Sequence, residues 1–170
     1  MKMSDALAGK FNDQITLELE SSIAYLQMAA YFDARSLKGM ASWMRIQADE
    51  ERLHALKFFD FVLDRGNKIQ IGSIPAPSLQ LDSALGAFRT ALAQEERVSS
   101  AIGDLYRIAS DDVDAASYPL LQWFLEEQVE EESIVSEIVD RLELIGDDGG
   151  ALLELDRELG TRSAAATEGA

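Results

Sequence analysis

Apolar side chains recur at alternating three- and four-residue spacing along four long stretches of this chain. That spacing places them on one face of a helix, so each stretch predicts an amphipathic α-helix. The predicted helices span residues 4–34, 38–65, 82–110 and 114–145. Strand-like alternation of apolar and polar residues is not sustained anywhere in the sequence. The predicted fold class is therefore all-α.

The lengths of the connections predict how these helices are arranged. Short links at residues 35–38 and 111–113 make the first pair and the last pair of helices antiparallel hairpins. The middle segment, which contains Pro75 and Pro77, is long enough to run the length of a bundle. Two antiparallel hairpins joined by one long crossover form a four-helix bundle. An apolar segment at 151–159 predicts a short fifth helix, so residues 1–160 are expected to form one domain and 161–170 a disordered tail.

Each predicted helix carries a row of core-facing residues that is apolar except near its middle. A carboxylate interrupts every row there, and no lysine or arginine lies on any of the four rows. Burying one unpaired carboxylate costs several kcal/mol, so acids that converge at one depth require cations between them. A divalent ion supplies the most charge for the space. The interrupting carboxylates are Glu18, Glu51, Glu95 and Glu131.

The only histidine of the chain narrows the kind of metal. Glu51 and His54 form a Glu-x-x-His pair, which lies on one helical face one turn apart. With Glu18 and Glu95 from two other helices, this is the pattern of carboxylate-bridged di-iron or di-manganese bundles, except that the second Glu-x-x-His pair is missing. Oxygen-rich ligation with one imidazole and no thiolate suits iron or manganese better than structural zinc.

Composition excludes several classes of protein. The sequence contains no cysteine, which excludes disulfides, iron–sulfur clusters and thiolate metal sites. A formal net charge of −16 disfavours nucleic acid as a partner. No run approaches the ~18 apolar residues of a membrane helix, and the first residues do not resemble a signal peptide. We therefore expect no membrane association and a cytoplasmic location.

Motifs along most of the chain resemble the ferroxidase centre of ferritins. In order and spacing, they are Glu18, Tyr25, Glu51-x-x-His54, Glu95 and Glu127-Gln128. The resemblance implies a ferritin-like bundle in which Glu18, Glu51 and His54 hold one iron. It also implies that Glu51 bridges to a second iron held by Glu95, with Gln128 or Glu131 nearby. Tyr25 would contact this centre, either as simple core packing or as an electron donor.

The last helix indicates a branch of the family. Glu130 stands where a bacterioferritin would place histidine, and Arg52 stands where that branch has its haem-binding methionine, so haem is not expected. Glu127, Glu130 and Glu131, together with Glu50, resemble the additional iron site of bacterial non-haem ferritins. The sequence is thus identified as a member of that branch, although acidic runs on a helix are usually solvated faces.

The function that this resemblance implies is iron storage and detoxification. Fe(II) would be oxidised by O₂ or H₂O₂ at two irons per chain, with a third site nearby, and the product would be stored inside a shell of 24 subunits. The alternative is a di-metal enzyme that reduces peroxide, resembling rubrerythrin or manganese catalase. The missing second histidine and the absence of cysteine count against it. A metal-free structural bundle and a DNA-coating miniferritin are further alternatives, and the acidic charge disfavours the second.

Overall fold

The computed structural model describes residues 1–79 and 81–163, and all regular structure in that part of the chain is helical. This confirms the predicted all-α class. None of the described helices is long and apolar enough to cross a membrane. The elements are α1 (Asp5–Asp33), α2 (Lys38–Asp64), α3 (Ala84–Asp111), the 3₁₀ turn η1 (Ala115–Ser117), α4 (Tyr118–Ile145) and α5 (Gly149–Leu159).

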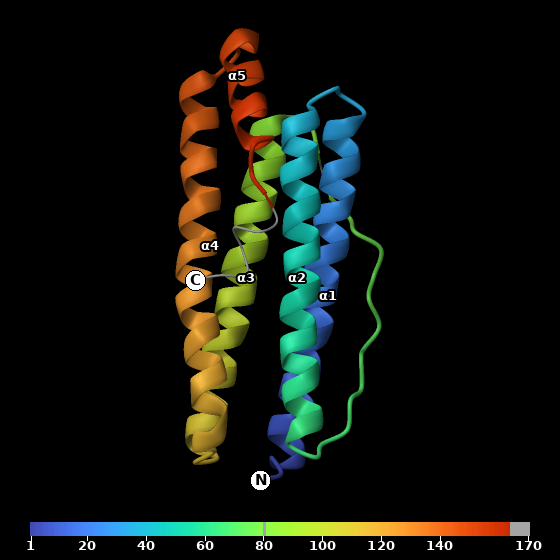
Figure 1. Ribbon diagram of the computed structural model, residues 1–170, viewed down its shortest axis with the longest axis vertical. Helices are drawn as coiled ribbons and strands as arrows, with labels where there is room; N and C mark the ends of the chain where they lie inside the picture. Colours follow the sequence, from blue (N-terminus) through green and yellow to red (C-terminus); the bar gives the residue numbers. More distant parts are fainter. Residues whose placement is uncertain (80, 164–170) are drawn as a thin grey trace.

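The helices are arranged as two antiparallel hairpins (Figure 1). α1 packs most extensively on α2, and α3 packs most extensively on α4. Between α2 and α3, the connecting segment runs along the outside of the bundle from one end to the other (Figure 1). The predicted topology, with its single long crossover, is confirmed.

Two helix starts show how local hydrogen bonding decides the boundaries. Ser4 accepts a hydrogen bond from the backbone N–H of Leu7 at 3.1 Å, as expected of an N-cap residue. α3, predicted to begin at residue 82, begins at Ala84. Its N-cap is Ser83, whose Oγ accepts a hydrogen bond from the N–H of Gly86 at 2.9 Å.

The start of the fourth helix was also predicted too early. Asp114 does not begin α4; it precedes η1, and α4 begins at Tyr118 with Pro119 in its first turn. The carboxylate of Asp114 is held by both Nη atoms of Arg65, at 3.0 and 2.6 Å. This bidentate pair joins the end of α2 to the turn before α4, so the chain continues through a 3₁₀ turn before the α-helix can start.

The apolar core is divided into two clusters along the bundle axis. One cluster lies toward the end that carries α5 and contains Tyr25, Phe32, Trp43 and Phe88. The other contains Phe11, Phe58, Ile102 and Phe124. Each cluster takes residues from all four long helices. Because the two are separate, a layer of different chemistry lies between them.

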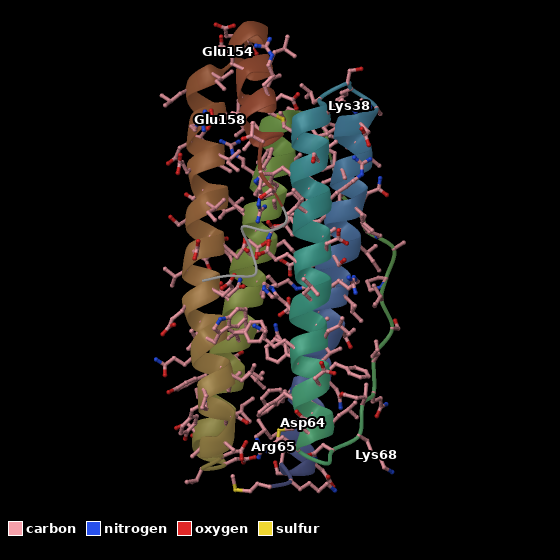
Figure 2. All side chains as sticks on the ribbon, in the orientation of Figure 1. Lys38, Asp64, Arg65, Lys68, Glu154 and Glu158 are labelled. Atoms are coloured by element: carbon pink, nitrogen blue, oxygen red, sulfur yellow. The ribbon has the colours of Figure 1, made fainter. Side chains whose placement is uncertain are left out.

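The fifth helix packs on the end of the bundle where α2 begins (Figure 2). α2 has no side-chain cap of its own at Leu37. Asp156 of α5 replaces it, because its Oδ1 accepts the backbone N–H of Met40 at 2.8 Å. On the other side, Arg141 of α4 binds Glu158 with two hydrogen bonds of 2.7 and 2.6 Å. The predicted fifth helix is confirmed, and it begins two residues earlier than expected.

Gly39 permits this close approach of α5 to α2. A Cβ atom at position 39 would lie 1.6 Å from the backbone oxygen of Asp156 and 3.0 Å from the backbone nitrogen of Gly160. Both neighbours are backbone atoms, so neither can rotate away. A side chain at position 39 would therefore push the end of α5 off the bundle.

We predict that Gly39→Ala lowers the free energy of unfolding by about 1–3 kcal/mol, the usual cost of overpacking. Urea unfolding followed by circular dichroism measures the change. Gly103→Ala in α3 is the control, because a Cβ there meets nothing within 4 Å. It should be neutral or stabilise the protein by roughly 0.5–1 kcal/mol, since alanine favours a helix interior. Equal stabilities for wild type and Gly39→Ala would contradict the packing described.

Candidate metal centre

A layer of buried polar side chains separates the two apolar clusters. It contains the residues that the core-facing rows indicated, and each is less than one-tenth exposed. All four long helices contribute to it. We refer to it as the polar layer; its members are Glu18, Gln47, Glu50, Glu51, His54, Glu95, Gln128 and Glu131.

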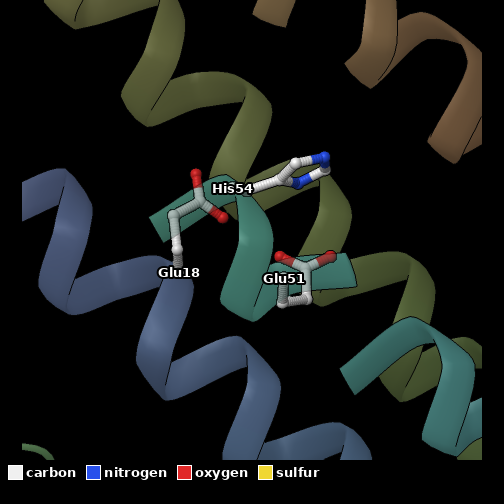
Figure 3. A group of neighbouring side chains, drawn as sticks. All are labelled: Glu18, Glu51 and His54. Atoms are coloured by element: carbon white, nitrogen blue, oxygen red, sulfur yellow. The ribbon is translucent and has the colours of Figure 1, made fainter. Parts of the chain in front are cut away.

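The structure brings three predicted ligands into one group. Glu18 extends from α1, and Glu51 and His54 extend from α2, toward a common point (Figure 3). One ligand atom from each residue lies within 4.8 Å of the others. Two carboxylates and an imidazole at this spacing can share one metal ion.

Unsatisfied atoms mark the same point. Among the described residues, three buried side-chain N or O atoms lack a hydrogen-bond partner: Oε2 of Glu18, Oε2 of Glu51 and Nδ1 of His54. Buried polar atoms in native proteins nearly always have a partner, so each exception calls for an explanation. All three exceptions belong to one group, and all three atoms are donors of electron pairs to a metal. The residues therefore fit a bound cation.

Neutral amides hold the carboxylates of this group without neutralising them. Gln14 Nε2 donates to Oε1 of Glu18 at 2.7 Å, and Gln47 Nε2 lies 3.5 Å from Oε1 of Glu51. Each carboxylate is thus held through one oxygen while the other oxygen stays free. This arrangement orients the free oxygens toward the shared point and leaves their charge available for a metal.

Aromatic rings orient the imidazole of His54. The rings of Trp123 and Phe124 meet it edge-on, with centroids 5.8 and 5.4 Å away. Burial, and to a smaller extent the positive charge of Lys57, lowers the pKa of His54 to about 4. The imidazole is therefore neutral near pH 7, which is the form that binds metals.

Glu95, predicted to hold a second iron, lies outside this group of three. Tyr25 donates its hydroxyl to Oε1 of Glu95, and Gln128 Nε2 lies 3.3 Å from Oε2. Glu131 is held from α2, because Gln47 Nε2 donates to its Oε2 at 2.8 Å. Glu95 and Glu131 are both buried in the polar layer, but neutral donors bind both oxygens of Glu95 and one oxygen of Glu131 in this structure.

A second group of potential ligands shares His54 with the first. Glu50, His54 and Glu127 each offer one atom within 4.8 Å of the others. Of the four acids that resemble an additional iron site, Glu50 and Glu127 are thus brought together. Glu130 is exposed and belongs to neither group of ligands, but its negative charge adds to burial in raising the pKa of Glu127. Its part in an additional iron site stays a prediction.

One residue that contacts the polar layer was not predicted from the sequence. Arg162, two residues beyond Gly160, donates to Oε1 of Gln47 at 2.7 Å and to Oε2 of Glu50 at 2.8 Å. It lies within the predicted disordered tail; residues 164–170 of that tail fall outside the described part of the chain, where the expectation stays a prediction. No helical pattern could have indicated Arg162, because it follows the last helix.

Burial changes the acidity of the whole polar layer. It raises the pKa of Glu18, Glu50, Glu95 and Glu131 to about 7 each. Burial, followed by the charges of Glu95 and Glu18, raises the pKa of Glu51 well above its usual range. The metal-free layer therefore retains protons that a bound cation would displace.

Comparison with known proteins identifies the family. A family model described as a ferritin-like domain matches residues 8–145. The chain belongs to the ferritin family. The bacterial non-heme ferritin of Staphylococcus haemolyticus is 42% identical over 161 residues, which cover 95% of this chain and 97% of that protein. Its counterpart in Staphylococcus aureus is 39% identical over the same coverage.

Solved ferritin structures agree with this assignment. The open pore ferritin of the archaeon Archaeoglobus fulgidus superimposes with a TM-score of 0.93 at 43% identity, covering 95% of this chain and 98% of that one. An engineered closed form of that ferritin gives the same TM-score at 42% identity, with 95% and 99% coverage. These relatives confirm the identification as a non-haem ferritin and support iron storage as the function of this ferritin.

The raised carboxyl pKa values predict how pH affects the metal-free protein. A carboxyl whose pKa is higher in the folded than in the unfolded state stabilises the folded protein at low pH, below the unfolded-state pKa. This stabilisation is lost as pH rises through the folded-state pKa, which is about 7 for Glu18 and Glu95. His54 acts in the opposite sense, but its contribution is complete above pH 6.5 and changes only as pH falls toward 4. With chelator present, we therefore predict that the thermal midpoint falls between pH 6.5 and pH 8.

Glu95→Gln tests whether buried carboxyls cause this pH dependence, because it removes one of them and keeps the shape of the side chain. This variant should have a higher metal-free midpoint at pH 8 and a weaker pH dependence than wild type. Glu96→Gln, at the next and exposed position of α3, should behave as wild type. A wild-type midpoint that stays constant or rises from pH 6.5 to 8 would show that the layer is not protonated as described.

Proposed function

We propose that this ferritin is a ferroxidase, which oxidises Fe(II) with O₂ at a di-iron centre in the polar layer. The observation that carries the proposal is the set of three unpartnered atoms on Glu18, Glu51 and His54. Iron is the substrate and the cargo of this site, since storage requires it to leave after oxidation. Oxygen-rich ligation with one neutral imidazole suits Fe(II) and remains suitable for Fe(III).

The first Fe(II) would bind between Glu18, Glu51 and His54. Its charge would displace protons from carboxyls whose pKa values burial has raised, so binding releases protons to solvent. Gln14 and the rings beside His54 hold the ligands in place before the metal arrives. Little reorganisation is then needed at this position.

The second Fe(II) would bind between Glu51, which would bridge the two ions, and Glu95, with Gln128 or Glu131 as a further ligand. Glu95 would have to exchange its bond from Gln128 for the metal, whereas Tyr25 can keep its hydrogen bond to the other oxygen. Two adjacent ions can deliver two electrons to one O₂. Tyr25 contacts a metal-binding carboxylate, which makes it the residue best placed to donate a further electron.

Self-assembly completes the proposal. Ferritin neighbours form shells, and we propose that this ferritin forms one of 24 subunits with no haem. Apolar side chains are exposed on the first hairpin, notably Leu26 on α1 and Leu56 on α2, and a subunit interface would cover them. At the position where haem ligation would require methionine, Arg52 is exposed on α2. The cytoplasmic location stays a prediction.

We predict that anaerobic titration gives two or three Fe(II) bound per chain, and that an O₂ pulse then oxidises them rapidly. Glu51→Gln should reduce binding by about two ions and slow oxidation by at least tenfold, because it removes the bridging charge. Glu96→Gln is the matched control, since it removes a carboxylate from the exposed face of α3. Absorbance of Fe(III) and O₂ uptake measure both effects.

Two outcomes would contradict this function. Equal oxidation rates in wild type and Glu51→Gln would exclude the polar layer as the site of oxidation. Rapid peroxide turnover without accumulation of iron would favour a peroxide-reducing di-metal enzyme instead.

The proposed shell can be tested separately through the mass of the assembled particle. A particle of 24 chains, each of 18.7 kDa, has a mass of about 450 kDa. Analytical ultracentrifugation of the purified protein should give this mass, and Leu26→Glu with Leu56→Glu should shift it to smaller species. A wild-type protein that sediments as a monomer or dimer would contradict the shell without affecting the metal site.

A further inference from the structure

The guanidinium of Arg162 occupies one side of the polar layer in this structure. Its Nη2 lies 2.8 Å from Oε2 of Glu50, and its Nη1 lies 2.7 Å from Oε1 of Gln47. The guanidinium carbon also lies 4.9 Å from the centre of the Trp43 ring. The Arg162 side chain is 16% exposed and the Glu50 side chain is 7% exposed. Among the described ion pairs, this is the one that reaches the polar layer.

The fold places Arg162 there through the docking of α5. Asp156 binds the first turn of α2, and Gly160 packs against Gly39. The chain that leaves α5 is therefore held next to α2, and two residues later Arg162 reaches Gln47 and Glu50 on the same helix. Arg162 is thus a cation delivered to the acids from outside the four core-facing rows.

Arg162 also fixes the orientation of the Gln47 amide. Because the guanidinium donates to Oε1 of Gln47, the amide nitrogen must face the other way. It donates there to Glu131 at 2.8 Å and lies 3.5 Å from Glu51. One arginine therefore influences carboxylates on two helices, one directly through Glu50 and others through Gln47.

The carboxylate that Arg162 holds is also a potential metal ligand. Glu50 forms a group with His54 and Glu127 whose ligand atoms lie within 4.8 Å of one another. A metal ion in this group would need the Glu50 carboxylate, and its charge would repel the guanidinium already bound to it. An imidazole has two ring nitrogens. His54 can therefore bind one metal ion together with Glu18 and Glu51 and another together with Glu50 and Glu127.

We infer that Arg162 is a tethered counter-ion that competes with a metal ion for the Glu50–His54–Glu127 group. This inference rests on the proposed function, since it concerns an additional ion beside the di-iron centre. With no metal, Arg162 neutralises Glu50 and closes that side of the layer. When an ion binds the group, Arg162 leaves Glu50 and releases Gln47. Because the two cations compete for one carboxylate, whatever weakens the binding of Arg162 to Glu50 strengthens metal binding to the group.

Anaerobic titration with Zn²⁺ tests this competition without redox chemistry, because Zn²⁺ binds carboxylates and imidazole but is not oxidised. Calorimetry on the assembled protein should resolve two tight equivalents and a weaker third. We expect Arg162→Gln to bind the third equivalent about tenfold more tightly, which corresponds to 1.4 kcal/mol. Arg162→Lys keeps the charge but has one nitrogen in place of the two that bind Gln47 and Glu50, so its affinity for the third equivalent should lie between those of wild type and Arg162→Gln.

Arg157→Gln is the control, since it removes an exposed arginine from α5. It should bind the third equivalent as wild type does. A merely structural role for Arg162 predicts equal effects of the Lys and Gln variants, whereas competition predicts a graded series.

Trp43 fluorescence gives an independent readout of where Arg162 lies. In a Trp123→Phe background, Trp43 is the remaining tryptophan, because the chain contains two. Its emission should change together with the third Zn²⁺ equivalent in the protein that carries Arg162. In Arg162→Gln this change should be absent, since there is no guanidinium beside the ring to release.

The outcomes separate this inference from the proposed function. If two tight equivalents bind wild type but the third binds Arg162→Gln no more tightly, the competition is overturned and the di-metal centre stands. If wild type lacks the two tight equivalents, the proposed function fails and the inference fails with it. A tighter third equivalent in Arg162→Gln, with unchanged behaviour of Arg157→Gln, supports the competition.

Discussion

The structure depends on one costly arrangement, the burial of several carboxylates at the same depth in an otherwise apolar bundle. Glu18, Glu51 and Glu95 are each at most 1% exposed, and none of them has a cationic partner among the described ion pairs. Unpaired burial of this kind costs several kcal/mol for each charge. The fold accepts that cost because a layer of charge is what attracts and holds metal ions.

The rest of the fold compensates for this layer. Two separate apolar clusters, one on each side, contain the large aromatic side chains and supply the packing that the layer cannot. Neutral amides, such as those of Gln14 and Gln47, fix the positions of carboxylates without cancelling their charge. Raised pKa values allow the carboxyls to hold protons whenever no metal is bound. Protons and metal ions can therefore replace each other in the polar layer.

The position of Arg162 also leaves the central carboxylates available for metal ions. A fixed positive charge among the central ligands would have excluded iron, and the four core-facing rows carry none. A charge on the segment after α5 can neutralise Glu50 and still leave, because it is attached by a short piece of chain rather than built into a helix. The docking of α5 on α2 thus links the end of the chain to the metal layer.

Helical spacing in the sequence was sufficient to predict the class, the topology and the central residues of the site. A core-facing row has a fixed period, so an acid such as Glu95 in that row must be buried wherever the helix packs. The same spacing could not predict contacts made from outside the rows, such as that of Arg162. It also assigned Glu130 to an additional iron site, and that assignment stays a prediction, because Glu130 is exposed and joins neither group of ligands. Helix starts depend on single hydrogen bonds, so α3 is capped by Ser83 and begins at Ala84 rather than at residue 82.

A crystal structure of the iron-loaded protein, with anomalous diffraction measured at the iron absorption edge, would locate the bound ions. We expect two anomalous peaks in the polar layer, one among Glu18, Glu51 and His54 and the other between Glu51 and Glu95. Iron peaks found only on the surface acids, with the polar layer free of anomalous density, would contradict this expectation.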